Sequence, residues 1–77
     1  MARIEIVRGT GTVSHFSIEG GFFAIRGDDG VVYDPIDLAA EFQRNGVRVR
    51  FEARLRKDLI GVHMVGPIVE ITSISAS

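Results

Sequence analysis

The sequence predicts an all-β domain of five strands, with one short helix between the third and fourth strands. Three observations lead to this prediction. Apolar and polar residues alternate with a period of two in several segments, which is typical of strands with one buried face. Glycine-containing turns separate these segments, and a single stretch with helix-starting and helix-ending residues interrupts them.

Length and composition indicate a single domain, residues 1–77, that depends on its apolar core for stability. The chain has 77 residues, 45% of them hydrophobic, and no cysteine. A disulfide framework or a thiolate zinc site therefore cannot supply stability. No stretch is long and apolar enough for a signal peptide or a membrane span, so we expect a cytoplasmic protein without a membrane partner.

The first strand is expected over residues 3–18 and is unusually long. Ile4 and Ile6 alternate with charged residues, so we expect both isoleucines to face the core. Val13 and Phe16 fall on opposite parities, which means that the alternation slips by one residue between them. A β-bulge at that point would absorb the slip.

The second and third strands are expected to form a hairpin. FFAIR, residues 22–26, and VVYD, residues 31–34, flank the turn sequence GDDG. Pro35 ends the third strand, because proline has no amide hydrogen to donate to a sheet.

A helix of about two turns is expected in the segment DLAAEFQRNG. Asp37 is a suitable N-cap residue, because its side chain can accept a hydrogen bond from the first free amides of a helix. Leu38 and Phe42 belong to an apolar stripe, and Asn45 and Gly46 are typical of a helix end. So short a helix depends on packing for its stability.

The fourth strand is expected over residues 47–56, and its alternation is the clearest in the chain. Its apolar positions would form one wall of the core: Val47, Val49, Phe51, Ala53 and Leu55. A fifth strand is expected over residues 62–74, with an interruption at Gly66-Pro67. The missing amide of Pro67 implies a bulge or an unpaired edge there.

In this order of elements the chain resembles the OB-fold, a five-stranded Greek-key barrel with its helix between strands three and four. The segments GGFFAIRGDDGVVYDPIDLAAEF and GVRVRF are similar to those of a group of small uncharacterised bacterial OB-fold proteins. The resemblance implies the strand order 1-2-3-5-4, with strand four closing on strand one. It implies an architecture and no activity. An SH3-like barrel is the alternative, but it would not readily explain the capped helix.

The first two strands also resemble those of cold-shock domains, which stack single-stranded nucleic acid on aromatic side chains. The likeness lies in GTVSHF and GGFFAIRGDDG. However, His15 and Phe16 stand where that family has a Trp-Phe pair, and VVYDPID lacks its second aromatic-histidine motif. The resemblance therefore implies shared barrel geometry and does not by itself imply RNA binding.

An outward aromatic on the second strand is the first candidate binding element. Phe22 and Phe23 are adjacent, so one of them faces outward, on the side where OB-folds usually bind ligands. Tyr33 and Arg26 could join it to form a stacking platform for single-stranded nucleic acid. The alternative needs no ligand: a loop, the end of the barrel or a second copy covers the outward ring.

Acidic residues surround this face and argue against phosphate binding there. They are Asp28, Asp29, Asp34 and Asp37, which we interpret as turn and capping residues. Acidic residues gather in segment 19–41 and basic residues in segment 44–57, while the net charge of the whole chain is only −1. The chain as a whole therefore has no general attraction for nucleic acid.

A row of arginines on the fourth strand is the second candidate element. Its members alternate with the apolar wall: Arg48, Arg50, Arg54 and Arg56. In an OB barrel they would project away from Phe22. One interpretation is a solvated face with ion pairs to Glu5, Glu52 and Glu70. The other is a stripe for nucleic acid, for an acidic protein surface or for the acidic half of a second copy, which would give weak self-association.

No pattern indicates catalysis, a metal site or a cofactor. Ser14 and His15 are neighbours in a strand and point to opposite faces, and His63 is the only other histidine. We therefore expect no enzyme and no cofactor, but a small OB-fold binding or interaction module whose ligand the sequence does not name. The alternative is a single-stranded nucleic-acid binder that uses the outward phenylalanine, Tyr33 and the arginines.

Overall fold

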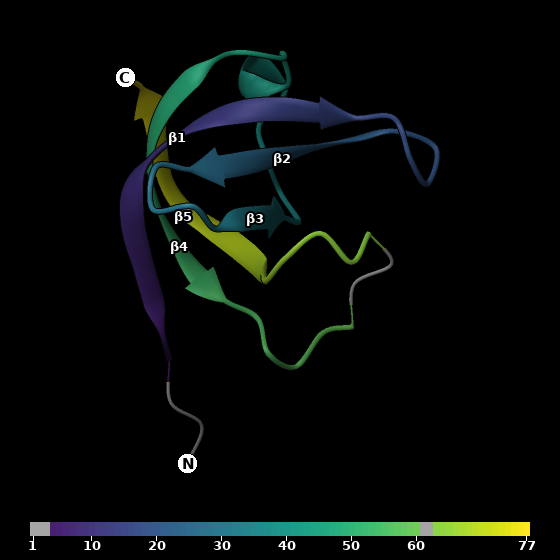
Figure 1. Ribbon diagram of the computed structural model, residues 1–77. Coiled ribbons are helices and arrows are strands. Elements are labelled where there is room, and N and C mark those ends of the chain that lie inside the picture. The colour runs from purple at the N-terminus through teal and green to yellow at the C-terminus, as the bar shows by residue number, and fades with distance from the viewer. Residues whose placement is uncertain (1–3, 61–62) are drawn as a thin grey trace.

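The computed structural model describes residues 4–60 and 63–77, in which five strands form a mixed sheet that closes into a ring (Figure 1). The strands are β1 (Ile6–Phe16), β2 (Phe22–Gly27), β3 (Val32–Pro35), β4 (Arg48–Leu55) and β5 (Ile68–Ala76). Residues 3 and 62, at which two strands were expected to begin, lie outside the described residues. No helix in the described part of the chain has the length and apolar character needed to cross a membrane.

The strands follow the order β1-β2-β3-β5-β4 around the ring, and β4 pairs with β1 to close it. This confirms the predicted order. All neighbours are antiparallel except β3 and β5, which run parallel over two positions, Asp34 opposite Ile68 and Pro35 opposite Val69. The first strand pairs with β2 through residues 11–16 and with β4 through residues 6–12, so it forms part of both walls.

The inward side chains of the strands and one residue of the β3–β4 connection fill the ring. The buried cluster consists of Val13, Ile25, Tyr33, Phe42, Val49, Phe51, Ala53 and Val69. Alternate residues of β4 are buried, as the pattern of segment 47–56 predicts, and the prediction of a core wall there is confirmed. The arginines of β4 alternate with this wall and point outward.

The first strand differs from its prediction in the direction of its side chains. Ile4 and Ile6 are 64% and 44% exposed, whereas Val7 packs against the core and Val13 is fully buried. The strand pairs with β2 and β4 in continuous register, so the predicted bulge is wrong. Phe16 simply points outward, because an aromatic partner on β2 shields it there. A register shift occurs instead between β4 and β5.

The connection from β3 to β4 contains one 3-10 turn, η1 (Ala40–Phe42), in place of the predicted two-turn helix. Asp37 does not cap it, because its Oδ1 accepts a hydrogen bond of 2.9 Å from the amide of Ile71. That amide lies beyond the short β3–β5 pairing and would otherwise lack a partner from β3. Phe42, at 8% exposure, anchors the turn to the core.

The assignment of the core can be tested with a matched pair of isoleucines. We expect Ile25→Ala to lower the free energy of unfolding by roughly 2–5 kcal/mol, because it leaves a cavity at a fully buried position. Ile60 is 98% exposed, so Ile60→Ala should change the free energy by less than about 0.5 kcal/mol. Urea unfolding followed by circular dichroism measures both values. Equal losses in the two variants would contradict this core.

Candidate binding site

Three rings form a stack on the outer face of β1 and β2, which we call the aromatic stack (Phe16, Phe22 and His63). Phe16 and Phe22 lie opposite each other across the two strands, with ring centroids 5.2 Å apart and planes inclined by 9°. His63, from the segment between β4 and β5, lies 3.6 Å from the Phe22 centroid with planes inclined by 3°. Phe22 is thus covered by a ring from another part of the chain.

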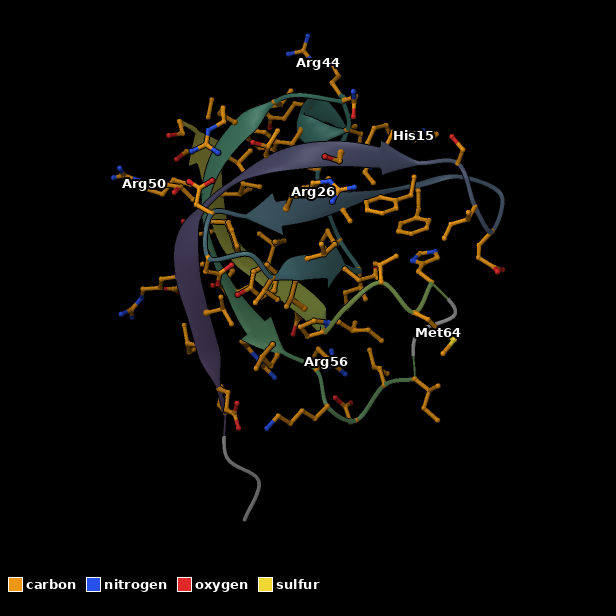
Figure 2. The ribbon with its side chains drawn as sticks, viewed as in Figure 1. His15, Arg26, Arg44, Arg50, Arg56 and Met64 are labelled. Carbon is orange, nitrogen blue, oxygen red and sulfur yellow. The ribbon has the colours of Figure 1, made fainter. Side chains whose placement is uncertain are left out.

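Arg26 extends the aromatic stack along the same face. Its guanidinium carbon lies 4.9 Å from the centroid of Phe16, a distance at which a cation is attracted to an aromatic ring. Figure 2 shows this arginine over β1 and β2, while Arg50 and Arg56 project from other sides of the ring. Arg26 therefore lies on the same outer face as Phe22.

The two adjacent phenylalanines take different sides of the sheet. Phe23 packs against the buried cluster and makes an edge contact with His15, at 5.0 Å between ring centroids. Phe22 faces outward and is half-buried in the aromatic stack. Of the two interpretations left open for the outward ring, the structure shows the one in which a connecting segment covers it.

Tyr33 does not belong to this face, so the prediction that it joins an exposed platform is wrong. It pairs with Ile25 across β2 and β3, points inward with it and is only 5% exposed. Its ring makes an edge contact with Phe51, and its hydroxyl donates a hydrogen bond of 2.6 Å to Asp29 Oδ2. Burial, followed by this bond to a carboxylate, raises the pKa of Tyr33 to about 12.

A histidine–carboxylate pair lies next to the aromatic stack. The Nδ1 of His63 lies 3.0 and 3.1 Å from the two carboxylate oxygens of Asp34, a β3 residue that is 6% exposed. The segment that carries His63 packs directly on β3. A side chain at Gly66 would overlap the carbonyl oxygen of Val32, so only glycine allows this approach. The next residue, Pro67, accepts a hydrogen bond from the amide of Asp34.

A cleft of about 330 Å³ opens beside this pair. It is lined by His15, Gly21, Phe22, Phe23, Asp34, Pro35, Ile36, Asp37, Leu38, Gln43 and His63. The lining combines aromatic walls with two carboxylates and contains no lysine or arginine among the described residues. The cleft lies at the end of β2 that has no pairing with β3, since that pairing involves only Ile25 and Arg26 on the β2 side.

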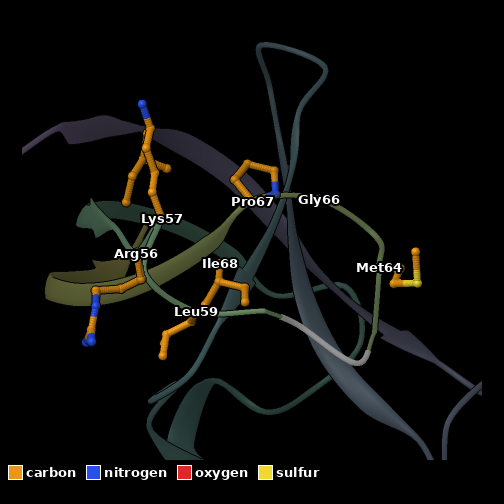
Figure 3. Close-up of a pocket in the computed structure, with 8 residues that line it drawn as sticks. Arg56, Lys57, Leu59, Met64, Gly66, Pro67 and Ile68 are labelled. Atoms are coloured by element: carbon orange, nitrogen blue, oxygen red, sulfur yellow. The ribbon is translucent and has the colours of Figure 1, made fainter.

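A second hollow of about 240 Å³ lies between the end of β4 and the start of β5 (Figure 3). Its walls include Leu59, Met64 and Ile68, and its basic residues are Arg56 and Lys57. Both basic groups are already paired, Arg56 with Asp58 at 2.8 Å and Lys57 with Glu5 at 2.6 Å. This hollow therefore has fewer uncommitted polar groups than the cleft.

The arginine row of β4 is largely neutralised by carboxylates, as the solvated-face interpretation expects. Arg54 and Arg56 approach Glu70 at 3.7 and 3.5 Å. The other two expected acids have different partners, since Glu52 pairs with Arg8 at 2.7 Å and Glu5 with Lys57. Within the part of the chain that the structure describes, Arg50 has no carboxylate within 4.0 Å.

The fourth arginine, Arg48, joins the basic and acidic parts of the chain within one molecule. Its guanidinium donates two hydrogen bonds to Asp28, at 2.8 and 2.7 Å, and a third to the hydroxyl of Thr12. The hydrogen bonds from Arg48, and then the one from Thr10, hold the pKa of Asp28 well below its usual range. The turn interpretation is therefore incomplete for Asp28, which has an ion-pair partner on β4. Asp29 does act in the turn, because its Oδ1 accepts a hydrogen bond from the amide of Val31.

One cross-strand row connects the arginines with the aromatic stack. Thr12 of β1 lies opposite Arg26 of β2 on one side and opposite Arg48 of β4 on the other. All three residues point outward, so the prediction that the β4 arginines all project away from the face of Phe22 is wrong for Arg48. The cause is the curvature of β1, which belongs to both walls of the ring.

The residues that build the cleft come from distant parts of the sequence. The sequence alone indicates a turn or capping role for Asp34 and no partner for His63, because the two residues are 29 positions apart. Gly66 and Pro67 are the local sequence feature that corresponds to this contact, because both residues lie against β3 in the structure. No group of three metal-binding side chains occurs among residues 4–60 and 63–77.

Comparison of the chain with protein-family models, with curated proteins and with solved structures finds no match in any of the three. The function is therefore inferred from the geometry and chemistry of the site.

The burial of Tyr33 can be tested by titration, because the chain has one tyrosine and no tryptophan. We expect the ultraviolet absorbance of the native protein to report phenolate formation at a pKa of about 12, against about 10 in urea. A raised folded-state pKa stabilises the fold below pH ~10, and this contribution is lost as the pH rises toward 12. Asp29→Asn should lower the pKa but leave it above 10, because burial is the larger cause.

Circular dichroism at each pH shows whether the protein is still folded during this titration. A folded protein whose tyrosine titrates like that of the unfolded chain would contradict the buried position of Tyr33.

Proposed function

We propose that this protein is a non-enzymatic binding module built on the OB-fold, a five-stranded Greek-key barrel. Three features of the fold support this assignment. The strand order is β1-β2-β3-β5-β4, the parallel pair is β3 with β5, and the 3-10 turn lies between β3 and β4. The long first strand, shared between two walls, is a fourth point of agreement with a small closed barrel.

The observation that carries the proposed function is the cleft beside the aromatic stack. It is concave, has apolar and aromatic walls, and holds a small number of polar groups, which is the usual composition of a ligand site. The described lining contains no hydroxyl, thiol or amine beside the His63–Asp34 pair that could serve as a nucleophile, which supports a binding role over covalent catalysis.

Three planar probes of nearly equal shape test this proposal: benzamide, benzoate and benzamidine. We expect at least one of them to shift the backbone amide signals of Phe22, Phe23 and Asp37 saturably in nuclear magnetic resonance titrations, because these residues line the cleft. The amides of Arg50 and Ser73, which line a different hollow, serve as internal controls and should not move. If no probe shifts the cleft amides, the cleft is not a binding site.

Single-stranded nucleic acid is a second candidate ligand, and one observation favours it. Arg26, Thr12 and Arg48 form a row that adjoins the aromatic stack on one outer face. Arginines that bind phosphates beside aromatic rings that stack bases are the usual elements of such a surface. Two facts weigh against it: Arg48 is paired with Asp28, and the rings of the stack already cover one another.

A matched pair of charge reversals tests the nucleic-acid candidate. A fluorescent oligothymidine should bind in low salt and dissociate steeply as the salt concentration rises. Arg26→Glu should weaken this binding about tenfold, because it removes a cation beside the stack. Arg44→Glu changes the same charge at an exposed position away from Arg26 (Figure 2) and should have a small effect. Fluorescence anisotropy measures both; absence of binding in low salt, or equal losses, would rule out this candidate.

A further inference from the structure

We infer that the cleft beside the aromatic stack binds an organic cation, a guanidinium or ammonium group, against Asp34 and Asp37. This inference rests on the proposed binding function of the cleft and adds the chemical class of its ligand. Such a group can come from a small molecule or from an arginine or lysine side chain of a peptide, and both sources present the same chemistry.

The first reason is the incomplete pairing of the Asp34 carboxylate. This side chain is 8% exposed, and among the described residues His63 is its only hydrogen-bond donor. In its neutral form an imidazole supplies one hydrogen bond and no charge. Buried carboxylates are normally matched by a cation or by several donors, because burial without them is costly. Asp34 therefore has acceptor capacity that the described residues leave unused.

The second reason is the charge of the cleft. Its lining includes Asp34 and Asp37, and none of its described lining residues is a lysine or an arginine. The Oδ1 of Asp37 accepts a hydrogen bond from the amide of Ile71, and no described donor contacts its Oδ2. The nearby cations are committed elsewhere, for example Arg48 to Asp28 and Arg56 to Asp58. Apart from its two histidines, His15 and His63, the described lining has no group that can carry a positive charge, so a cation from a ligand would meet two carboxylates there.

The third reason is the shape and character of the walls. The outward ring of Phe22 and the rings of Phe23 and His15 line the cleft together with Leu38. Such walls accommodate the methylene stem of a lysine or an arginine while its charged head meets a carboxylate. Guanidinium groups in particular can donate two parallel hydrogen bonds to one carboxylate. An anionic ligand would meet two negative charges at the same place.

The three planar probes separate this inference from the proposed function. Benzamidine, benzamide and benzoate are close in shape and differ mainly in charge. We expect benzamidine to bind in the cleft at least about tenfold more tightly than benzamide, because it adds charge-assisted hydrogen bonds, and benzoate to bind most weakly. If benzamide or benzoate binds as tightly as benzamidine, the cleft is a binding site but the cation inference is wrong. If none binds, both are wrong.

Matched Asp→Asn variants show which carboxylate causes the preference for benzamidine over benzamide. Asp34→Asn keeps the shape and an oxygen for His63 but removes the negative charge, so it should abolish the preference for benzamidine over benzamide. Asp58→Asn removes one charge outside the cleft and should leave the preference unchanged. Asp37 is exposed, so Asp37→Asn should fold and should reduce the preference for benzamidine severalfold. It provides a second measurement if Asp34→Asn does not fold. If Asp34→Asn folds, an unchanged preference for benzamidine over benzamide in this variant would overturn the inference. If Asp34→Asn does not fold, an unchanged preference in Asp37→Asn would overturn it.

Two further ligands distinguish the sources of the cation. N-acetyl-arginine amide represents a free small cation, and a blocked pentapeptide with a central arginine between alanines represents a polypeptide. If the pentapeptide binds clearly more tightly than N-acetyl-arginine amide, the ligand is a protein partner. If the two affinities are equal, it is a small molecule. The matching citrulline compounds, which are uncharged, should not bind in either case, and their binding at the same affinity would overturn the inference.

Discussion

The double pairing of β1 is the constraint on which the rest of the structure depends. One strand pairs with β2 along its second half and with β4 along its first half, and the pairing with β4 closes the ring. Gly11 lies where the two pairings overlap, opposite both Gly27 and Val49. A Cβ atom at Gly11 would approach the carbonyl oxygen of Arg26 to 2.6 Å and Cγ2 of Ile25 to 2.8 Å. The tight curvature of β1 is possible because this position has no side chain.

The position of the cleft follows from this closure. The parallel contact between β3 and β5 covers only two residue pairs, and β3 also pairs with β2 over only two. The ring is therefore weakly paired around β3, and hydrogen bonds outside the regular ladder complete it there. The side chain of Asp37 accepts a hydrogen bond from an amide of β5, and the carbonyl of Pro67 accepts one from the amide of Asp34. A concave region with polar groups forms where regular pairing ends, while the strongly paired walls of β1, β4 and β5 are filled by core side chains.

Local patterns predicted the parts of the fold that depend on neighbouring residues. The alternation in segment 47–56 and the turn signal of GDDG both correspond to the observed strands, because burial with period two and turn chemistry are local properties. The bulge between Val13 and Phe16 was wrongly predicted because periodicity does not show whether an outward apolar residue, such as Phe16, finds a partner on the neighbouring strand. The pairing of His63 with Asp34, and the use of Asp37 by β5, depend on contacts between distant segments that have no local signature.

The place of β5 in the ring also determines when the fold can be completed. β5 lies between β3 and β4 in the ring, and both of these strands precede it in the sequence. Until β5 is in place, β4 lacks one neighbour, and the edges of β3 and β4 remain unpaired. Without β5, Val49 and Phe51 would lie beside an open edge of β4, so the insertion of β5 protects a surface that would otherwise be prone to aggregation.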